Sequence, residues 1–128
     1  YMTSTKNFNP NTDPKLLCTC GHPKCDKRSV KQQVLNRVQY IRDDADRPLI
    51  ITSGGRCPYH PNEIHRKKPA DHQNQIAVDM FYGNILERNE LIVLAGRYGA
   101  NAVAVGKTFI HMAWREDAGD RVRTWEYK

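Results

Sequence analysis

Two histidines and one aspartate are the residues of this chain whose types and spacing first suggest chemistry. His72 and Asp79 are seven residues apart, and His111 stands alone near the C-terminus. Two imidazoles and one carboxylate form the ligand set of a catalytic zinc site, which keeps its fourth position for water. Each of the three lies beside a short apolar run typical of a strand, and strands hold side chains in fixed positions. Together they favour a metal site made of His72, Asp79 and His111.

On its own, each of these residues has an ordinary explanation, because strand-end carboxylates and hydrogen-bonded core histidines are common. Alternation along residues 76–81 places Asp79 on the face opposite the large apolar side chains. A carboxylate in such an apolar segment needs a partner or a metal. A hairpin of residues 102–105 and 109–114, laid beside residues 76–81, would bring His111 next to Asp79.

The apolar periodicity of the chain predicts two main helices. The first would be capped by Ser29 and run to about Asp44, and the second would cover residues 87–98, with Gly99 as its C-terminal cap. Their spacing of three, four and seven predicts which side chains face the core. These are Val30, Val34, Leu35, Val38 and Ile41 in the first helix, and Leu91, Leu94 and Ala95 in the second.

Short apolar runs between polar segments predict the strands of an antiparallel sheet, so the fold class is α+β. Residues 1–28 hold three of the four cysteines and several prolines, so we expect an irregular arm packed on a single domain of residues 29–128. Residues 53–70 form a long polar loop, which in a small domain is usually functional or disordered. The expected strands cover residues 49–52, 76–81, 102–105, 109–114 and 123–127.

Four short motifs follow one another along the chain. They are Ser53-Gly54-Gly55-Arg56 with the polar residues His60 and Asn62 behind it, His72 with Ala77 and Asp79, Phe109-Ile110-His111, and Arg123-x-Trp125. In order and spacing they resemble the M15-type, hedgehog-like zinc peptidases of cell-wall metabolism. That family includes D-alanyl-D-alanine carboxypeptidases and phage endolysins. The resemblance spans roughly residues 8–127.

This resemblance implies a small hedgehog-like fold in which His72, Asp79 and His111 hold zinc. It also implies that Arg56, Ser53 and Asn62 bind substrate. An arginine suits that role because its planar fork grips a carboxylate through two hydrogen bonds, although a loop arginine can also pair with a surface acid. The implied activity is hydrolysis of peptidoglycan stem peptides next to a D-amino acid, as a carboxypeptidase or an endopeptidase. A monomer in the bacterial periplasm or cell wall, or a phage-encoded protein, would fit it.

Three positions depart from the family pattern. Ala70 stands where the family has serine, Gln75 where it has glycine, and Ala113 where it has an acid; related branches place that acid where this chain has Thr108. Such an acid moves protons during hydrolysis, which is worth roughly 10²–10⁴-fold in rate. The chain is therefore either an enzyme with a displaced or engineered-out base, or a catalytically silent zinc domain that binds cell wall or a protein partner, for example in a phage particle. Candidate substitutes for the base are His65, Asp71 and Glu116.

The four cysteines leave three possibilities open. Cys18, Cys20 and Cys25 lie in the arm with His22 among them, and Cys57 follows Arg56 directly. A disulfide from the arm to Cys57 would fasten the substrate loop. The cysteines could instead bind a second, structural zinc, although the usual Cys-x2-Cys spacing is missing. They could also be free thiols.

Composition limits the remaining functions. The 128 residues suffice for about one domain, and a net charge of +6 favours anionic partners such as peptidoglycan. Nucleic acid is a weaker candidate, because lysine and arginine do not cluster on one element. No apolar run approaches the roughly 20 residues of a membrane span. No charged-then-apolar leader opens the sequence, so we expect no secretory signal in it.

Overall fold

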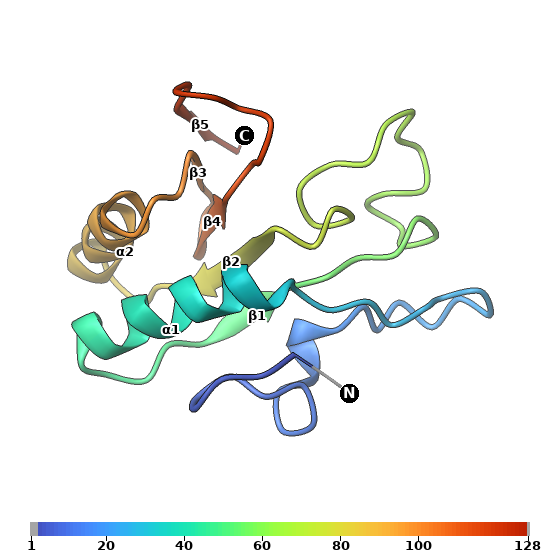
Figure 1. Cartoon of the computed structure of the whole chain (residues 1–128), viewed down its shortest axis with the longest axis horizontal. Coiled ribbons are helices and arrows are strands. Elements are labelled where there is room, and N and C mark those ends of the chain that lie inside the picture. Colours follow the sequence, from blue (N-terminus) through green and yellow to red (C-terminus); the bar gives the residue numbers. More distant parts are fainter. Residues whose placement is uncertain (1–2, 128) are drawn as a thin grey trace.

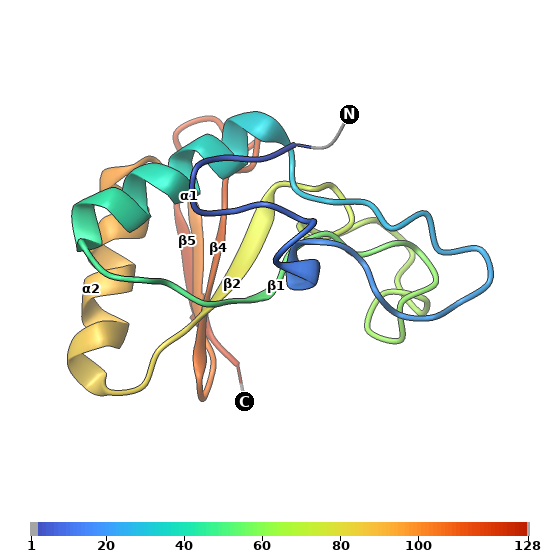
Figure 2. The ribbon, with the colours of Figure 1, turned by 90° about the horizontal axis from the view of Figure 1, so that it is seen from below.

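Both helices pack on one face of a five-stranded sheet, and long loops extend beyond one end of it (Figure 1, Figure 2). The computed structural model describes residues 3–127. In chain order its elements are the short 3-10 helix η1 (Pro14–Leu16), α1 (Gln32–Ala45), β1 (Ile51–Ser53), β2 (Ala77–Phe81), α2 (Ile85–Arg97), β3 (Ala102–Val105), β4 (Phe109–Ala113) and β5 (Arg123–Glu126). The predicted α+β class with two main helices is confirmed.

The sheet has the strand order β1-β2-β4-β3-β5. Its first four strands pair antiparallel, as the sequence predicted, but β5 runs parallel to β3. The cause is the connection after β4. The chain leaves β4 at Ala113, which pairs with Ala102, and re-enters the sheet at Arg123, which also pairs with Ala102. It therefore starts β5 at the end where it left β4, on the far side of β3.

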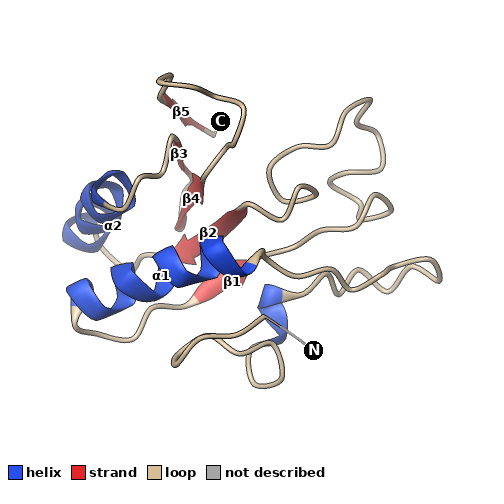
Figure 3. Cartoon of the chain, viewed as in Figure 1, coloured by secondary structure: helices blue, strands red, loops and turns tan. Residues whose placement is uncertain are grey.

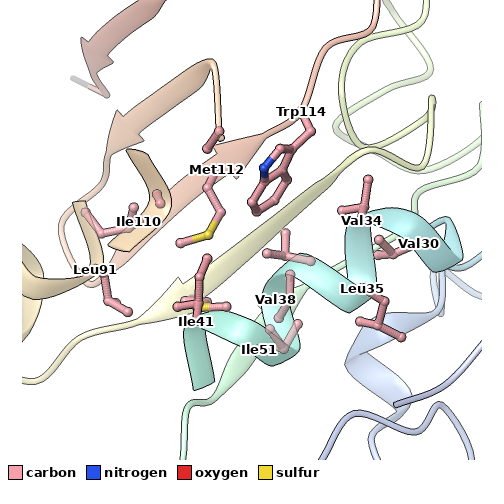
Figure 4. Close-up of a cluster of buried hydrophobic side chains, with 14 of the residues drawn as sticks. Val30, Val34, Leu35, Val38, Ile41, Ile51, Leu91, Ile110, Met112 and Trp114 are labelled. Atoms are coloured by element: carbon pink, nitrogen blue, oxygen red, sulfur yellow. The ribbon is translucent and has the colours of Figure 1, made fainter. Parts of the chain in front are cut away.

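The core lies between the helices and the sheet (Figure 4). Every side chain that the helical spacing placed inward is buried, although Val30, the first of them, precedes α1. The sheet contributes its large apolar residues from alternate positions, chiefly Met80, Ile110 and Met112. The opposite face of the same strands carries the small residues Ala77, Ala102 and Ala113 under Trp125. Alternation therefore places Asp79 and His111 on this second face, away from the helices.

The predicted start of the first helix is wrong. α1 begins at Gln32 with Lys31 in the N-cap position, and the buried Ser29 hydroxyl has no hydrogen-bond partner within residues 3–127. The backbone N–H of Lys31 donates to the carbonyl of Gln75 at 2.8 Å. This tertiary contact holds Lys31 in an extended conformation, so α1 begins two residues after Val30, where the apolar stripe begins. The second helix begins two residues earlier than predicted, because Asn84 caps it through the N–H of Glu87.

Most of residues 3–28 and of the segment between β1 and β2 is loop (Figure 3). The two segments meet backbone to backbone at Gly54 and Gly55. Gly55 N–H donates to the carbonyl of Leu16 at 3.0 Å. A Cβ on Gly55 would lie 2.1 Å from the Arg28 carbonyl oxygen. Only glycine allows this approach, so the arm is fitted against the loop that precedes Arg56. Within residues 3–127 no helix is long and apolar enough to cross a membrane.

Gly55→Ala tests this close contact. We expect it to lower the free energy of unfolding by about 1–3 kcal/mol or more, because backbone atoms must move to admit the methyl group. Gly96→Ala is the matched control: a Cβ there meets nothing within 4 Å, and Gly96 lies in α2. That change should be neutral or stabilise by roughly 0.5–1 kcal/mol. Urea unfolding of both variants measures the difference, and equal midpoints would contradict the packing described.

Candidate metal centre

His111 and Asp79 face each other across two neighbouring strands. They are register partners in the β2–β4 pair, and His111 Nδ1 lies 3.0 Å from Asp79 Oδ1. The hairpin of β3 and β4 beside β2 thus has the arrangement that the sequence predicted. His72 comes from the turn before β2, and its Nε2 lies 3.2 Å from both His111 Nδ1 and Asp79 Oδ1. All three side chains are buried.

Gln75 closes the turn that carries His72. It has φ 64°, in the left-handed region that favours glycine, and its N–H donates to the His72 carbonyl. The family pattern has glycine at this position, and the observed φ explains why. Here a glutamine adopts the same conformation, so the departure in sequence leaves the turn intact.

Both imidazoles are held so that a lone pair points at the shared centre. His72 Nδ1 donates to the carbonyl of Gly54 at 2.7 Å, which leaves Nε2 free to coordinate. His111 Nε2 donates to Asp71 Oδ2 at 3.0 Å, which leaves Nδ1 free. Metal-ligating histidines are characteristically oriented in this way by a carbonyl or carboxylate on the other nitrogen.

Three lone pairs within 3.0–3.2 Å of one another repel unless a proton or a cation lies between them. In a tetrahedral zinc site with bonds of about 2.0–2.1 Å, ligand atoms are separated by roughly 3.3 Å. The separations here come close to this value, so the residues present fit a zinc ion. The ion would be held by His72 Nε2, Asp79 Oδ1 and His111 Nδ1, with its remaining position toward the cavity.

The carboxylates and imidazoles of this centre shift one another's pKa. Burial alone would raise the pKa of Asp79, but when no metal is bound, a proton shared with the facing nitrogens of His111 and His72 holds it well below its usual range. Burial would lower the pKa of His111, yet its contacts with Asp71 and Asp79 raise it. Each shift favours a site in which anionic carboxylates surround a cation.

Asp71 is fixed from two sides. Arg115 donates to both of its carboxylate oxygens, at 2.8 and 2.9 Å, while His111 donates to one of them. Burial alone would raise the pKa of Asp71, but these donors hold it far below its usual range. A carboxylate so engaged is suited to orienting His111. Arg115, two residues beyond β4, was not recognised from the sequence, which gave no sign that it reaches back to Asp71.

Arg56 lies at the edge of the three candidate metal ligands. Its Nε donates to the Ser53 hydroxyl at 3.2 Å, and one guanidinium nitrogen lies 3.6 Å from Asp79 Oδ2. The other donates to Glu63 Oε2 at 3.3 Å. Glu63 is buried, and Gln73 and Arg66 also contact its carboxylate. Glu63 was not predicted from the sequence, because nothing in the polar loop distinguishes it from the other polar residues there.

A cavity of about 550 Å³ opens above these residues. This volume is within the range of small-ligand sites. Asn62 and His65, both expected near the substrate, line it and are exposed. Its charged lining residues are balanced before any metal binds: Arg56, Arg66 and Arg115 against Glu63, Asp71 and Asp79. A divalent ion would make the cavity electropositive and favourable to an anionic ligand.

Ala113 shares a sheet face with His111, as predicted, but it does not line the cavity. It is fully buried between Ala77 and Ala102 and is covered by Trp125. Glu116 also lies elsewhere, in an exposed ion pair with Lys31.

A family model described as Peptidase M15 matches residues 8–113, well over half of the chain. The chain belongs to the peptidase M15 family. Comparisons with curated proteins and with solved structures gave no match. Within this M15 chain the three candidate ligands, Asp71 and Arg56 all fall in the matched segment. Arg115, Trp125 and Tyr127 lie beyond it.

Metal content tests the ligand assignment. We expect His72→Ala, Asp79→Ala and His111→Ala each to lower the bound zinc by about one ion per chain, because three protein ligands are needed to hold it. His65→Ala is the matched control, since it removes an exposed histidine from the same cavity. Elemental analysis of the folded variants measures the loss. Unchanged zinc in the His111 variant would show that another residue completes the site.

Asp71→Ala separates orientation of His111 from proton transfer. If Asp71 orients His111, zinc affinity should fall about 10–100-fold with all three ligands still present. If Asp71 were instead the general base, zinc affinity would stay the same and only turnover would fall. Competition with a chelator of known affinity measures the change, and Glu116→Ala, which alters an exposed acid, should leave affinity unaltered.

Proposed function

We propose that this protein is a zinc-dependent peptidase that hydrolyses peptidoglycan stem peptides at a bond next to a D-amino acid. The observation that carries the proposal is the convergence of three oriented lone pairs beneath an open cavity, with Arg56 beside them. A closed structural site would need a fourth protein ligand, whereas this set leaves one position open. Such a substrate would place the protein in a bacterial cell wall or periplasm, or in a phage particle.

A zinc ion bound there would polarise the substrate carbonyl and would lower the pKa of its bound water to about 7. The residues of the chain would hold the ion and orient its ligands. His72, Asp79 and His111 fix the position of the ion, and the Gly54 carbonyl and Asp71 fix the two imidazoles. The burial of the ligands excludes bulk water from this floor of the cavity, which strengthens each electrostatic interaction there.

Arg56 would bind a carboxylate of the substrate. Stem peptides carry several carboxylates, and a guanidinium can grip one through two parallel hydrogen bonds. Because Arg56 lies 3.6 Å from an oxygen of the ligand Asp79, a carboxylate held there would bring the neighbouring peptide bond close to the metal position. Glu63 and Ser53 hold the guanidinium in place. The partly exposed Arg66 adds positive charge at the same wall.

Aromatic residues form another wall of the cavity. Phe109, Trp125 and Tyr127 line it, and the rings of Phe109 and Tyr127 lie 5.5 Å apart. Burial raises the pKa of Tyr127, and its ring lies 6.4 Å from the ring of His111. We propose that these rings pack against the aliphatic part of the peptide.

A catalytically silent domain that binds cell wall is the second candidate, and Ala113 is the observation that favours it. The family pattern has an acid there, and this chain buries a methyl group instead. Incubation of purified muropeptides with and without a chelator, read by mass spectrometry, decides between the two. Metal-dependent loss of a residue or splitting of a stem peptide supports the peptidase. Binding without any mass change supports the silent domain.

Arg56→Lys tests the substrate contact. We expect muropeptide binding or turnover to weaken at least about tenfold, because a point charge cannot replace the planar fork. Amidation of the substrate's terminal carboxylate should weaken the wild type to a similar degree. Arg66→Lys is the matched control and should have a smaller effect, since Arg66 is more exposed. Wild-type behaviour in both the variant and the amidated substrate would remove Arg56 from the site.

Ala113→Asp, compared with the isosteric Ala113→Asn, tests the missing acid. If Ala113 is the position of a lost base, the aspartate variant should raise turnover by about 10²-fold or more and the asparagine variant should not. If a different residue already serves, the parent should be active. Both variants should then only lose stability, since each buries a polar group under Trp125. His65→Ala and Asp71→Ala identify the substitute.

A further inference from the structure

Four cysteines from two distant segments converge outside the candidate metal centre. Cys18, Cys20 and Cys25 come from the arm, and Cys57 comes from the loop after β1. Their sulfur atoms all lie within 4.8 Å of one another. Cys18 and Cys57 are buried, and all four are free thiols. Chance rarely gathers four thiols from segments that are more than thirty residues apart.

The sulfur separations match a metal site better than disulfides. Cys20 Sγ lies 3.5 Å from Cys57 Sγ. A disulfide would bring the two atoms to about 2.05 Å. Four thiolates around a tetrahedral zinc, with Zn–S bonds of about 2.3 Å, would be roughly 3.8 Å apart. A complete set of four cysteines is also the usual ligand set of a structural zinc, which has no open position.

One of the four sulfur atoms already accepts a hydrogen bond from a backbone N–H. The N–H of Lys27 donates to Cys25 Sγ at 3.4 Å, two residues along the chain. Hydrogen bonds to coordinating sulfur offset the negative charge that four thiolates bring to one divalent ion.

His22 does not compete for a place among the ligands. Its ring stacks on Tyr59 with centroids 4.5 Å apart, and its Nδ1 accepts from the N–H of Lys24. This stacking adds a second contact between the arm and the loop, two residues after Cys57. Gly21, with φ 79°, makes the turn that allows the arm to present Cys20 and Cys25 to the same point.

We propose that Cys18, Cys20, Cys25 and Cys57 bind a structural zinc ion that fastens the arm to the loop carrying Arg56. Cys57 directly follows Arg56, and Gly54, three residues before it, supplies the carbonyl that orients His72. The bound ion would thus hold the Cys57 end of this short segment, and the hydrogen bond from the Gly55 N–H to the Leu16 carbonyl holds its other end against the arm. The site stands independently of the peptidase proposal, because it shares no ligand with the candidate metal centre.

Zinc counting in a variant without the first site tests this directly. Native mass spectrometry should find about two zinc ions on the wild-type chain and about one on the double variant His72→Ala/His111→Ala. Titration of that variant with an organic mercurial, in the presence of a metallochromic indicator, should release its zinc as four thiols react. Cobalt substituted into the same variant should show intense thiolate-to-metal charge-transfer absorption.

These results also separate the two proposals from each other. Zinc that remains after the histidine changes and leaves with the mercurial supports the cysteine site, whether or not the protein is a peptidase. A double variant without zinc, or cobalt without thiolate absorption, would overturn it. So would a fresh, unoxidised protein in which mass analysis finds the cysteines paired as disulfides.

Cys20→Ser then tests what the ion does, with Thr19→Ala, a change of the exposed neighbouring residue, as the control. The cysteine variant should lose about one zinc ion, melt at a lower temperature and bind zinc more weakly at the histidine site, because Gly54 is less firmly held. The threonine variant should behave as wild type. If Cys20→Ser does not fold, the cobalt and mercurial measurements on the cysteine-intact chain still decide the proposal.

Discussion

The candidate metal centre is defined by three lone pairs that lie close enough to repel one another when no cation is present. His72 Nε2, Asp79 Oδ1 and His111 Nδ1 lie within 3.0–3.2 Å, and hydrogen bonds behind the two imidazoles prevent either ring from turning away. Only a positive charge makes this arrangement favourable. The residues behind the ligands come from separate parts of the chain: Gly54 after β1, and Asp71 together with Arg115 around β2 and β4. The loops bring these hydrogen-bonding groups together behind the two imidazoles.

Strand register accounts for the part of the site that the sequence predicted well. Alternation put Asp79 on the face opposite Met80, and a hairpin beside β2 was enough to place His111 next to it. Both placements follow from the two-residue repeat of a strand and from the short connection of a hairpin, which can be recognised from neighbouring residues in the sequence. The apolar stripes of α1 and α2 were predicted correctly for the same reason.

Contacts between distant segments account for what the sequence did not reveal. Ser29 does not cap α1, because the carbonyl of Gln75 binds the Lys31 N–H and keeps the chain extended. Glu63 and Arg115 act through partners whose proximity no spacing rule indicates. β5 pairs parallel to β3 because of where its connection re-enters the sheet. Likewise, no spacing rule indicated that the sulfur atoms of the four cysteines lie within 4.8 Å of one another.

Anomalous diffraction from a crystal grown with zinc tests the account most directly, because it locates the ion and its ligands together. The account predicts a zinc peak about 2.0–2.1 Å from His72 Nε2, Asp79 Oδ1 and His111 Nδ1, with the fourth position open to the cavity. A crystal with zinc elsewhere and with His111 rotated out of contact with Asp79 would contradict it. A crystal grown at saturating zinc with no peak between the three side chains would also contradict it, because a proton alone would then hold them together.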